Sequence, residues 1–190
     1  MRLIFLPFFP FRLVSRRAAI ALMALAALAG GAAHARQAAQ VEPLPAQITR
    51  LAQQGRTDEA LAKAREYLER EPQDVQMRFI QSNLLAQSGR TDEAEAALVQ
   101  LTRDYPELAE PYNNLAVLHA ASGHLEKARE ALETALRLDP GYATARENLG
   151  DIYLRLAASA YEQAAARPES AGEARQRLTD KAAAIGKLLR

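Results

Sequence analysis

The chain has 190 residues with 24 Lys and Arg against 23 Asp and Glu, which gives a formal net charge of +1. This length allows one ordinary domain, or one domain with a targeting segment, and the near-neutral charge argues against a nucleic-acid-binding protein. Because the chain has no cysteine, disulfides, thiolate zinc sites, iron–sulfur clusters and cysteine nucleophiles are excluded. Its apolar residues are mainly Ala and Leu, which favour helix over sheet.

Residues 1–35 have the three parts of a secretory signal. All charged residues in this range are basic, an apolar run of 12 residues follows at 18–29, and Ala33 and Ala35 place small residues where a signal peptidase reads. As a helix the run would span about 18 Å, which is too short for the roughly 30 Å apolar core of a bilayer. We therefore expect cleavage after Ala35 and export to the periplasm. An uncleaved segment that anchors the protein in the inner membrane is the alternative, and is the only membrane contact we expect.

Cleavage would remove four arginines and no acid, so that 20 basic residues would face 23 acidic ones and the net charge would become −3. The segment that follows, residues 36–45, contains two prolines and no apolar period, which is typical of a linker. The prolines limit the next predicted helix to about residues 46–54.

A period of 34 residues organises the chain beyond the linker. The hexapeptide Gly-Arg-Thr-Asp-Glu-Ala occurs at 55–60 and again at 89–94. Three residue types keep the same register over two periods, which chance does not explain. They are a glycine, an alanine and a proline: Gly55, Gly89 and Gly123; Ala60, Ala94 and Ala128; Pro72, Pro106 and Pro140.

Each of these markers has a physical role in a helical hairpin. The glycine ends a helix in the left-handed conformation, and Thr57 and Thr91 are placed to cap the next helix, whereas Leu125 predicts a weaker cap in the third copy. The alanine allows two helices to pack closely. The residue before the proline leaves the helical region, so the second helix ends there. Each period therefore predicts a helix, a tight turn and a second helix.

The pattern resembles the tetratricopeptide repeat (TPR) family. The third period carries the fullest match, in Tyr112, Leu115, Ala116, Gly123, Ala128, Leu132, Ala135 and Pro140, whereas the second has Arg78 at a position that is usually aromatic. The resemblance implies an all-α fold, an α-solenoid of stacked hairpins. Its array would cover 46–167, with units at about 41–74, 75–108 and 109–142 and a partial fourth at 143–167. We expect the fourth to be one long helix, and residues 168–190 to hold a capping helix over the last repeat.

No pattern of catalytic or metal-ligating residues occurs in the sequence. His119 and His124 are five residues apart across a helix break, which is not the i, i+4 spacing of a helical metal pair, and we expect His119 to be packed in the core. The sequence contains no Gly-rich phosphate loop and no serine in a G-x-S-x-G turn. We therefore expect no enzyme, no cofactor, no metal and no small-molecule substrate.

The resemblance also implies a concave groove lined by the first helix of each hairpin. Asparagine is a poor helix former, so several on one helix face call for a reason, and an amide that donates and accepts at once suits the backbone of an extended peptide. The alternative is that they are merely polar residues on a solvated groove. The residues expected in the groove are Phe79, Asn83, Asn113, Asn114, Val117, Glu147, Asn148 and Asp151.

The nature of the partner is only partly predicted. Some TPR domains clamp a C-terminal carboxylate with Asn and basic residues, but Phe79 and Asn148 stand where basic residues would be needed. Glu147 and Asp151 instead make the groove acidic at the fourth unit. We therefore expect an apolar or basic segment of an unidentified protein, with Phe79 and Val117 as the apolar floor. The resemblance implies an exported scaffold that supports complex assembly in the envelope; a self-associating structural protein is the alternative.

Overall fold

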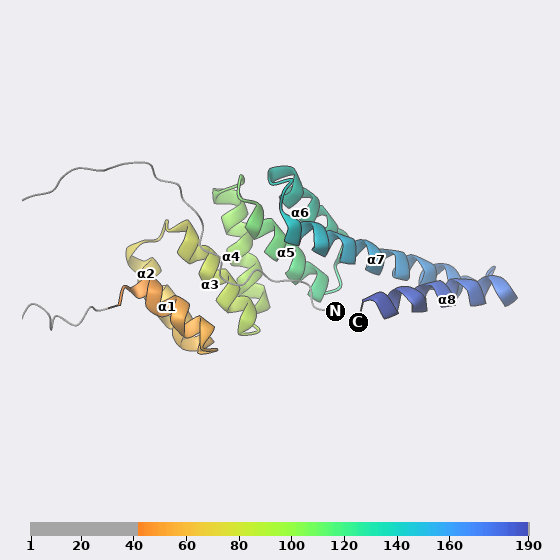
Figure 1. Cartoon of the computed structure of the whole chain (residues 1–190), viewed down its shortest axis with the longest axis horizontal. Coiled ribbons are helices and arrows are strands. Elements are labelled where there is room, and N and C mark those ends of the chain that lie inside the picture. The colour runs from red at the N-terminus through yellow and green to blue at the C-terminus, as the bar shows by residue number, and fades with distance from the viewer. Residues whose placement is uncertain (1–41, 190) are drawn as a thin grey trace, which may run out of the picture.

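The computed structural model describes residues 42–189, so the predicted signal segment, with Ala33 and Ala35, lies outside the described residues. The described range is all helical and confirms the predicted solenoid of stacked hairpins (Figure 1). No helix in this range is long and apolar enough to cross a membrane. The helices are α1 (Leu44–Gln53), α2 (Thr57–Arg70), α3 (Val75–Gln87), α4 (Thr91–Asp104), α5 (Ala109–Ala121), α6 (Leu125–Leu138), α7 (Ala143–Ala166) and α8 (Gly172–Leu188).

Helix α1 begins at Leu44, inside the segment that the sequence predicts as linker. Pro45 lies in its first turn, where backbone N–H groups have no acceptor within the helix, so the proline costs no hydrogen bond there. Glu42 and Arg50 form an ion pair at 2.9 Å that ties the entering chain to the helix. The prediction of a helix start at residue 46 is therefore wrong by two residues.

The predicted turn glycines are confirmed. Gly55, Gly89 and Gly123 have φ angles of 73°, 75° and 79°, in the left-handed region. At the third turn the Gly123 N–H donates to the Ala120 carbonyl at 3.2 Å, and the His124 N–H donates to the His119 carbonyl at 2.8 Å. This paired arrangement is the Schellman motif, which satisfies the last carbonyls of the preceding helix.

The expected threonine caps are wrong. Helix α2 begins at Thr57 itself, its N-cap position is Arg56, and no side chain caps it. Arg56 instead binds the carboxylate of Glu59 in the first turn, with 2.6 Å between Nε and Oε1. Arg90 and Glu93 form the same pair in the repeated hexapeptide. Because the turn after each glycine is one residue shorter than predicted, Leu125 also stands at the first helical position and no cap is lost there.

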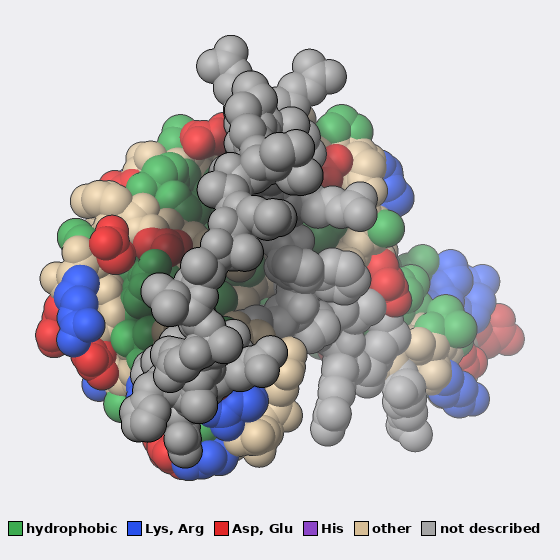
Figure 2. Space-filling view, turned by 60° about the vertical axis from the view of Figure 1, so that its left-hand side comes forward, with side chains coloured by type: hydrophobic (Ala, Val, Ile, Leu, Met, Phe, Trp, Pro, Cys, Tyr) green, Lys and Arg blue, Asp and Glu red, His purple; other side chains and the backbone are tan. Residues whose placement is uncertain are grey.

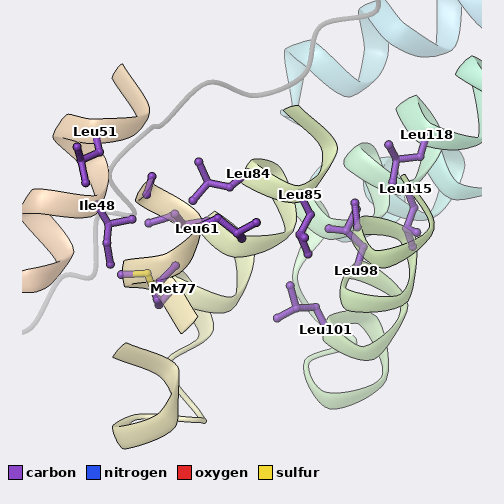
Figure 3. Close-up of a cluster of buried hydrophobic side chains, with 14 residues drawn as sticks. Ile48, Leu51, Leu61, Met77, Leu84, Leu85, Leu98, Leu101, Leu115 and Leu118 are labelled. Atoms are coloured by element: carbon purple, nitrogen blue, oxygen red, sulfur yellow. The ribbon is translucent and has the colours of Figure 1, made fainter. Parts of the chain in front are cut away.

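The core runs continuously from one hairpin to the next. Figure 3 shows Ile48 and Leu51 of α1 beside Leu61 and Met77, followed by leucines of α3, α4 and α5. The repeated alanines, Ala60, Ala94 and Ala128, are fully buried, which confirms their predicted place at close helix contacts. Each hairpin therefore buries its apolar face against its neighbours and not only within itself.

Arg78, the departure in the second unit, has a specific role in the structure. Its guanidinium binds Asp104 of α4 at 2.6 Å and lies over the ring of Tyr105, 5.7 Å from the ring centre. The Tyr105 hydroxyl in turn donates to the backbone carbonyl of Gln73 at 3.2 Å. An arginine thus joins the two helices of this hairpin where an aromatic ring is usual.

Helix α7 runs without a break over 24 residues, as predicted. It is longer than the first helices of the earlier hairpins, so its second half extends beyond α5 and α6. Helix α8 packs along this half, and Figure 1 shows the two as a hairpin that projects from the array. The ammonium of Lys181 lies 5.1 Å from the ring centre of Tyr161 within it. Helix α8 thus packs against the partial fourth repeat, as expected, along the half of α7 that projects from the array.

Two glycines of this fold should respond oppositely to the same substitution. Gly123→Ala should lower the free energy of unfolding by about 1–2 kcal/mol, because a side chain strains the left-handed conformation. Gly150→Ala should raise it by about 0.5–1 kcal/mol, because Gly150 lies inside α7 and an added Cβ meets no atom within 4 Å. Urea denaturation of both variants measures the difference. Equal effects of the two substitutions would contradict the role given to the turn.

Candidate functional site

The first helices of the hairpins, α1, α3, α5 and α7, share one side of the array, which we call the first-helix wall. Contacts join α3 to α5 and α5 to α7 along it. All four asparagines of the chain lie there, in one hydrogen-bonded row across three helices. The Asn114 amide donates to Asn83 at 2.7 Å, Asn113 donates to Asn114 at 3.1 Å, and Asn148 donates to Asn113 at 2.9 Å.

These asparagines are buried, with Asn83 at 4% exposure the most accessible of them. The sequence predicts amides that face a peptide backbone, whereas in the structure they first bind one another. The row therefore also holds three repeats together, a structural role that sequence reasoning did not find. Each amide has two N–H donors and one oxygen acceptor, and Asn83 contributes only its oxygen to the row. The amide nitrogen of Asn83 is therefore not used within the row.

The other predicted groove residues differ from one another in how deeply they are buried. Phe79 is half-buried and packs against the hydrophobic core, so part of its ring serves the core and not the predicted apolar floor. Val117 is half-buried on α5, one turn beyond the paired asparagines. On α7, Glu147 is exposed and Asp151 is buried.

A hollow of about 540 Å³ opens between α1 and α3, at the opposite end of the wall from α7. Met77 and Ile80 supply large apolar side chains to it, and Arg50 and Glu42 lie on its border as an ion pair. Sequence reasoning missed this feature, because it placed the apolar floor at Phe79. The remaining lining residues are Pro45, Ala46, Thr49, Gln53, Asp74 and Gln76.

The α7 end of the wall is acidic. Burial, and after it the negative charge of Glu147, raises the pKa of Asp151. The nearby Arg155 lowers this pKa only weakly, and its guanidinium donates to the carbonyl of Ala120 at 3.0 Å. The wall thus combines a hollow of mixed polar and apolar lining at one end, an amide row in the middle and carboxylates at the other end.

His119 is largely buried, with its side chain 14% exposed, as the sequence predicts. Its Nδ1 lies 3.9 Å from a carboxylate oxygen of Glu95, and it has no hydrogen-bond partner in the part of the chain that the structure describes. Burial lowers the pKa of His119, and the charge of Glu95 only partly opposes this effect. The imidazole is therefore held neutral near pH 7.

The described residues contain no group of three or more His, Asp or Glu side chains that could hold a metal ion. On the face seen in Figure 2, acidic and basic side chains are interspersed over the repeat array and over the projecting α7–α8 hairpin. This mixed surface differs from the basic stripe that a nucleic-acid-binding protein presents.

These features define an α-solenoid built on a repeat of 34 residues. Two family models, both described as tetratricopeptide repeat, match residues 46–109 and residues 109–142. The chain belongs to the tetratricopeptide repeat family. A search of curated protein sequences finds no match.

Solved structures share the fold at low sequence identity. The first TPR domain of human RPAP3 is 20% identical with a TM-score of 0.57, and the match covers 62% of this chain and 92% of that one. The first TPR of Spaghetti (RPAP3) bound to the HSP90 peptide SRMEEVD is 20% identical with a TM-score of 0.56, covering 60% and 90%. MamA from Desulfovibrio magneticus RS-1 is 20% identical with a TM-score of 0.55, covering 77% and 74%.

The asparagine row can be tested with a double-mutant cycle. Asn83→Ala and Asn114→Ala should each cost about 1–3 kcal/mol of unfolding free energy, because each leaves a buried amide without its partner. The double variant should cost about 1 kcal/mol less than the sum of the two. Chemical denaturation measures all three. The control pair is Asn83 with Asn148, which do not bond directly and should be more nearly additive. Strict additivity for Asn83 and Asn114 would contradict the row.

His119 should make the fold sensitive to mild acid. Because its pKa in the folded state lies below the usual value of about 6.5, the unfolded chain takes up a proton first as the pH falls. Stability from this group is therefore present above about pH 6.5 and declines below it, towards the lower pKa of the folded state. His119→Phe should flatten the curve of unfolding free energy between pH 7.5 and pH 5.5. His124→Gln, which removes a neighbouring charge that also lowers the pKa of His119, should flatten the curve less than His119→Phe does.

Proposed function

We propose that this protein is an exported TPR scaffold of the periplasm whose first-helix wall binds an extended segment of another envelope protein and so supports assembly of a complex. The observation that carries the proposal is the asparagine row, which brings together every asparagine of the chain on three helices of one wall. Amides at regular intervals can donate to and accept from an extended backbone without reading its side chains. No catalytic role is part of the proposal.

A structural neighbour supports a peptide as ligand. The first TPR of Spaghetti (RPAP3) binds the HSP90 peptide SRMEEVD, which is acidic at its C-terminal end. The first-helix wall of this chain has two carboxylates, Glu147 and Asp151, at its α7 end, and these would repel an acidic segment. An apolar or basic segment therefore fits this wall better than an acidic one. The periplasmic location rests on residues 1–35, and anchorage in the inner membrane by an uncleaved segment is the alternative.

Exposed apolar side chains on the last two helices support a second candidate function, self-association. Tyr153 of α7 and Leu188 of α8 are large apolar residues with exposures of 49% and 68%. Such surface favours contact with another protein, including a second copy of this chain. Sedimentation at micromolar concentration separates the two functions, because a stable dimer formed through the first-helix wall would exclude the adaptor.

A substitution on the wall should prevent partner binding without unfolding the chain. Val117→Arg places a long cation beside the asparagine row, at a residue outside the hydrophobic core clusters. Crosslinking in the native envelope followed by mass spectrometry identifies the partner of the unmodified protein. We expect that the Val117→Arg variant no longer recovers this partner.

The matched control is Ala62→Arg, which adds the same side chain at an exposed position of α2. It should leave partner recovery unchanged, and both variants should keep their helicity by circular dichroism. Equal recovery of the partner with Val117→Arg and the unmodified protein would contradict binding at the wall.

A further inference from the structure

A largely buried carboxylate at the α7 end of the first-helix wall has no hydrogen bond or ion pair within residues 42–189. Asp151 is 9% exposed, and among the described residues it accepts no hydrogen bond and forms no ion pair. Burial, and after it the charge of Glu147, raises the pKa of Asp151, and the charge of Arg155 opposes this effect only in part. Buried charges in proteins are ordinarily paired, so this position calls for a cation supplied by another molecule.

The bases nearest to Asp151 bind other groups. Arg155, one turn further along α7, donates to the carbonyl of Ala120 at the end of α5. Arg146 donates to the carbonyl of Pro140 in the turn that precedes this helix. Helix α5, which packs against α7, contains no Lys or Arg. Neither guanidinium forms an ion pair with Asp151 in the part of the chain that the structure describes.

The carboxylates lie where the asparagine row ends. Glu147 and Asp151 are four residues apart, so their side chains share one face of α7. Asn148, between them in sequence, closes the row by donating to Asn113. A chain whose backbone follows the row therefore reaches both carboxylates with a side chain at its α7 end.

We propose that Glu147 and Asp151 bind a lysine or arginine side chain of an extended protein segment, and so fix the position of that segment along the asparagine row. This inference rests on the proposed function. An ammonium or guanidinium group supplies several N–H donors to two carboxylates, and such charge-assisted hydrogen bonds are stronger than neutral ones. The amide row would hold the backbone, and the carboxylate pair would select the side chain.

The test uses peptides selected from a random decapeptide phage library on the purified full chain. The selected peptides should carry Lys or Arg at one constant position. Binding of a synthetic, fluorescently labelled peptide should weaken by about tenfold or more in the double variant Glu147→Gln, Asp151→Asn, the loss expected when a charged hydrogen-bond partner is removed. Replacing the basic residue of the peptide by norleucine should weaken binding to the unmodified protein by the same factor. The unmodified protein and the double variant should then bind this norleucine peptide with equal affinity.

The matched control variant is Glu69→Gln with Glu107→Gln, which removes two exposed carboxylates away from the wall and should leave binding unchanged. The melting temperature of Asp151→Asn separates binding from a structural role. It should stay constant or rise, because an unpaired buried charge is removed. A large fall in the melting temperature would show that Asp151 holds the fold together and would overturn the proposal.

The possible failures are distinguishable from one another. Selected peptides without a constant basic residue, or equal binding by the double variant, would overturn the cation site and leave binding at the wall intact. Selection of no peptide at all would overturn both the cation site and the proposed function. Equal weakening in the control variant would assign the effect to net charge and would also overturn the site.

Discussion

The packing of each helical hairpin against the next is the constraint on which the rest of this protein depends. A pair of short amphipathic helices cannot bury its apolar surface alone, so the core of the first hairpin is completed by Met77 and Leu84 of the second. The helices approach closely only because fully buried alanines such as Ala94 and Ala128 stand between them. This stacking aligns the first helices on one side, and the wall that we propose as the binding site exists only through it.

In the proposed function, the asparagine row contributes to stability and to binding at the same time. A buried amide is costly without a partner, and amides from α3, α5 and α7 supply partners for one another only when the three helices are in register. The row therefore favours one stacking of the repeats over others. In the proposed function the same row lies along the path of a bound segment, so a change in the row would alter binding as well as stability.

Several elements were predictable because their causes are local. A glycine that follows an apolar helix face ends that helix, and the three turn glycines have the left-handed conformation as expected. The uninterrupted α7 was also predictable, since no glycine turn or proline divides it. The missed features depend on detail that the period does not contain. The helices begin at Leu44 and Thr57 because the residue before each of them takes the N-cap position, which the period does not specify. Arg78 can replace an aromatic ring only because Asp104 and Tyr105 lie beside it.

The sequence by itself determined the repeat, its length, the number of complete hairpins and the family, because these follow from glycine, alanine and proline at a constant spacing. Only the tertiary structure decided which side chains meet. It joined asparagines more than 30 residues apart, left Asp151 without a hydrogen bond from any described residue, and packed α8 along the projecting half of α7. The physical reason is that a helical period specifies the face on which a residue lies, whereas burial and pairing depend on which helix arrives to cover that face.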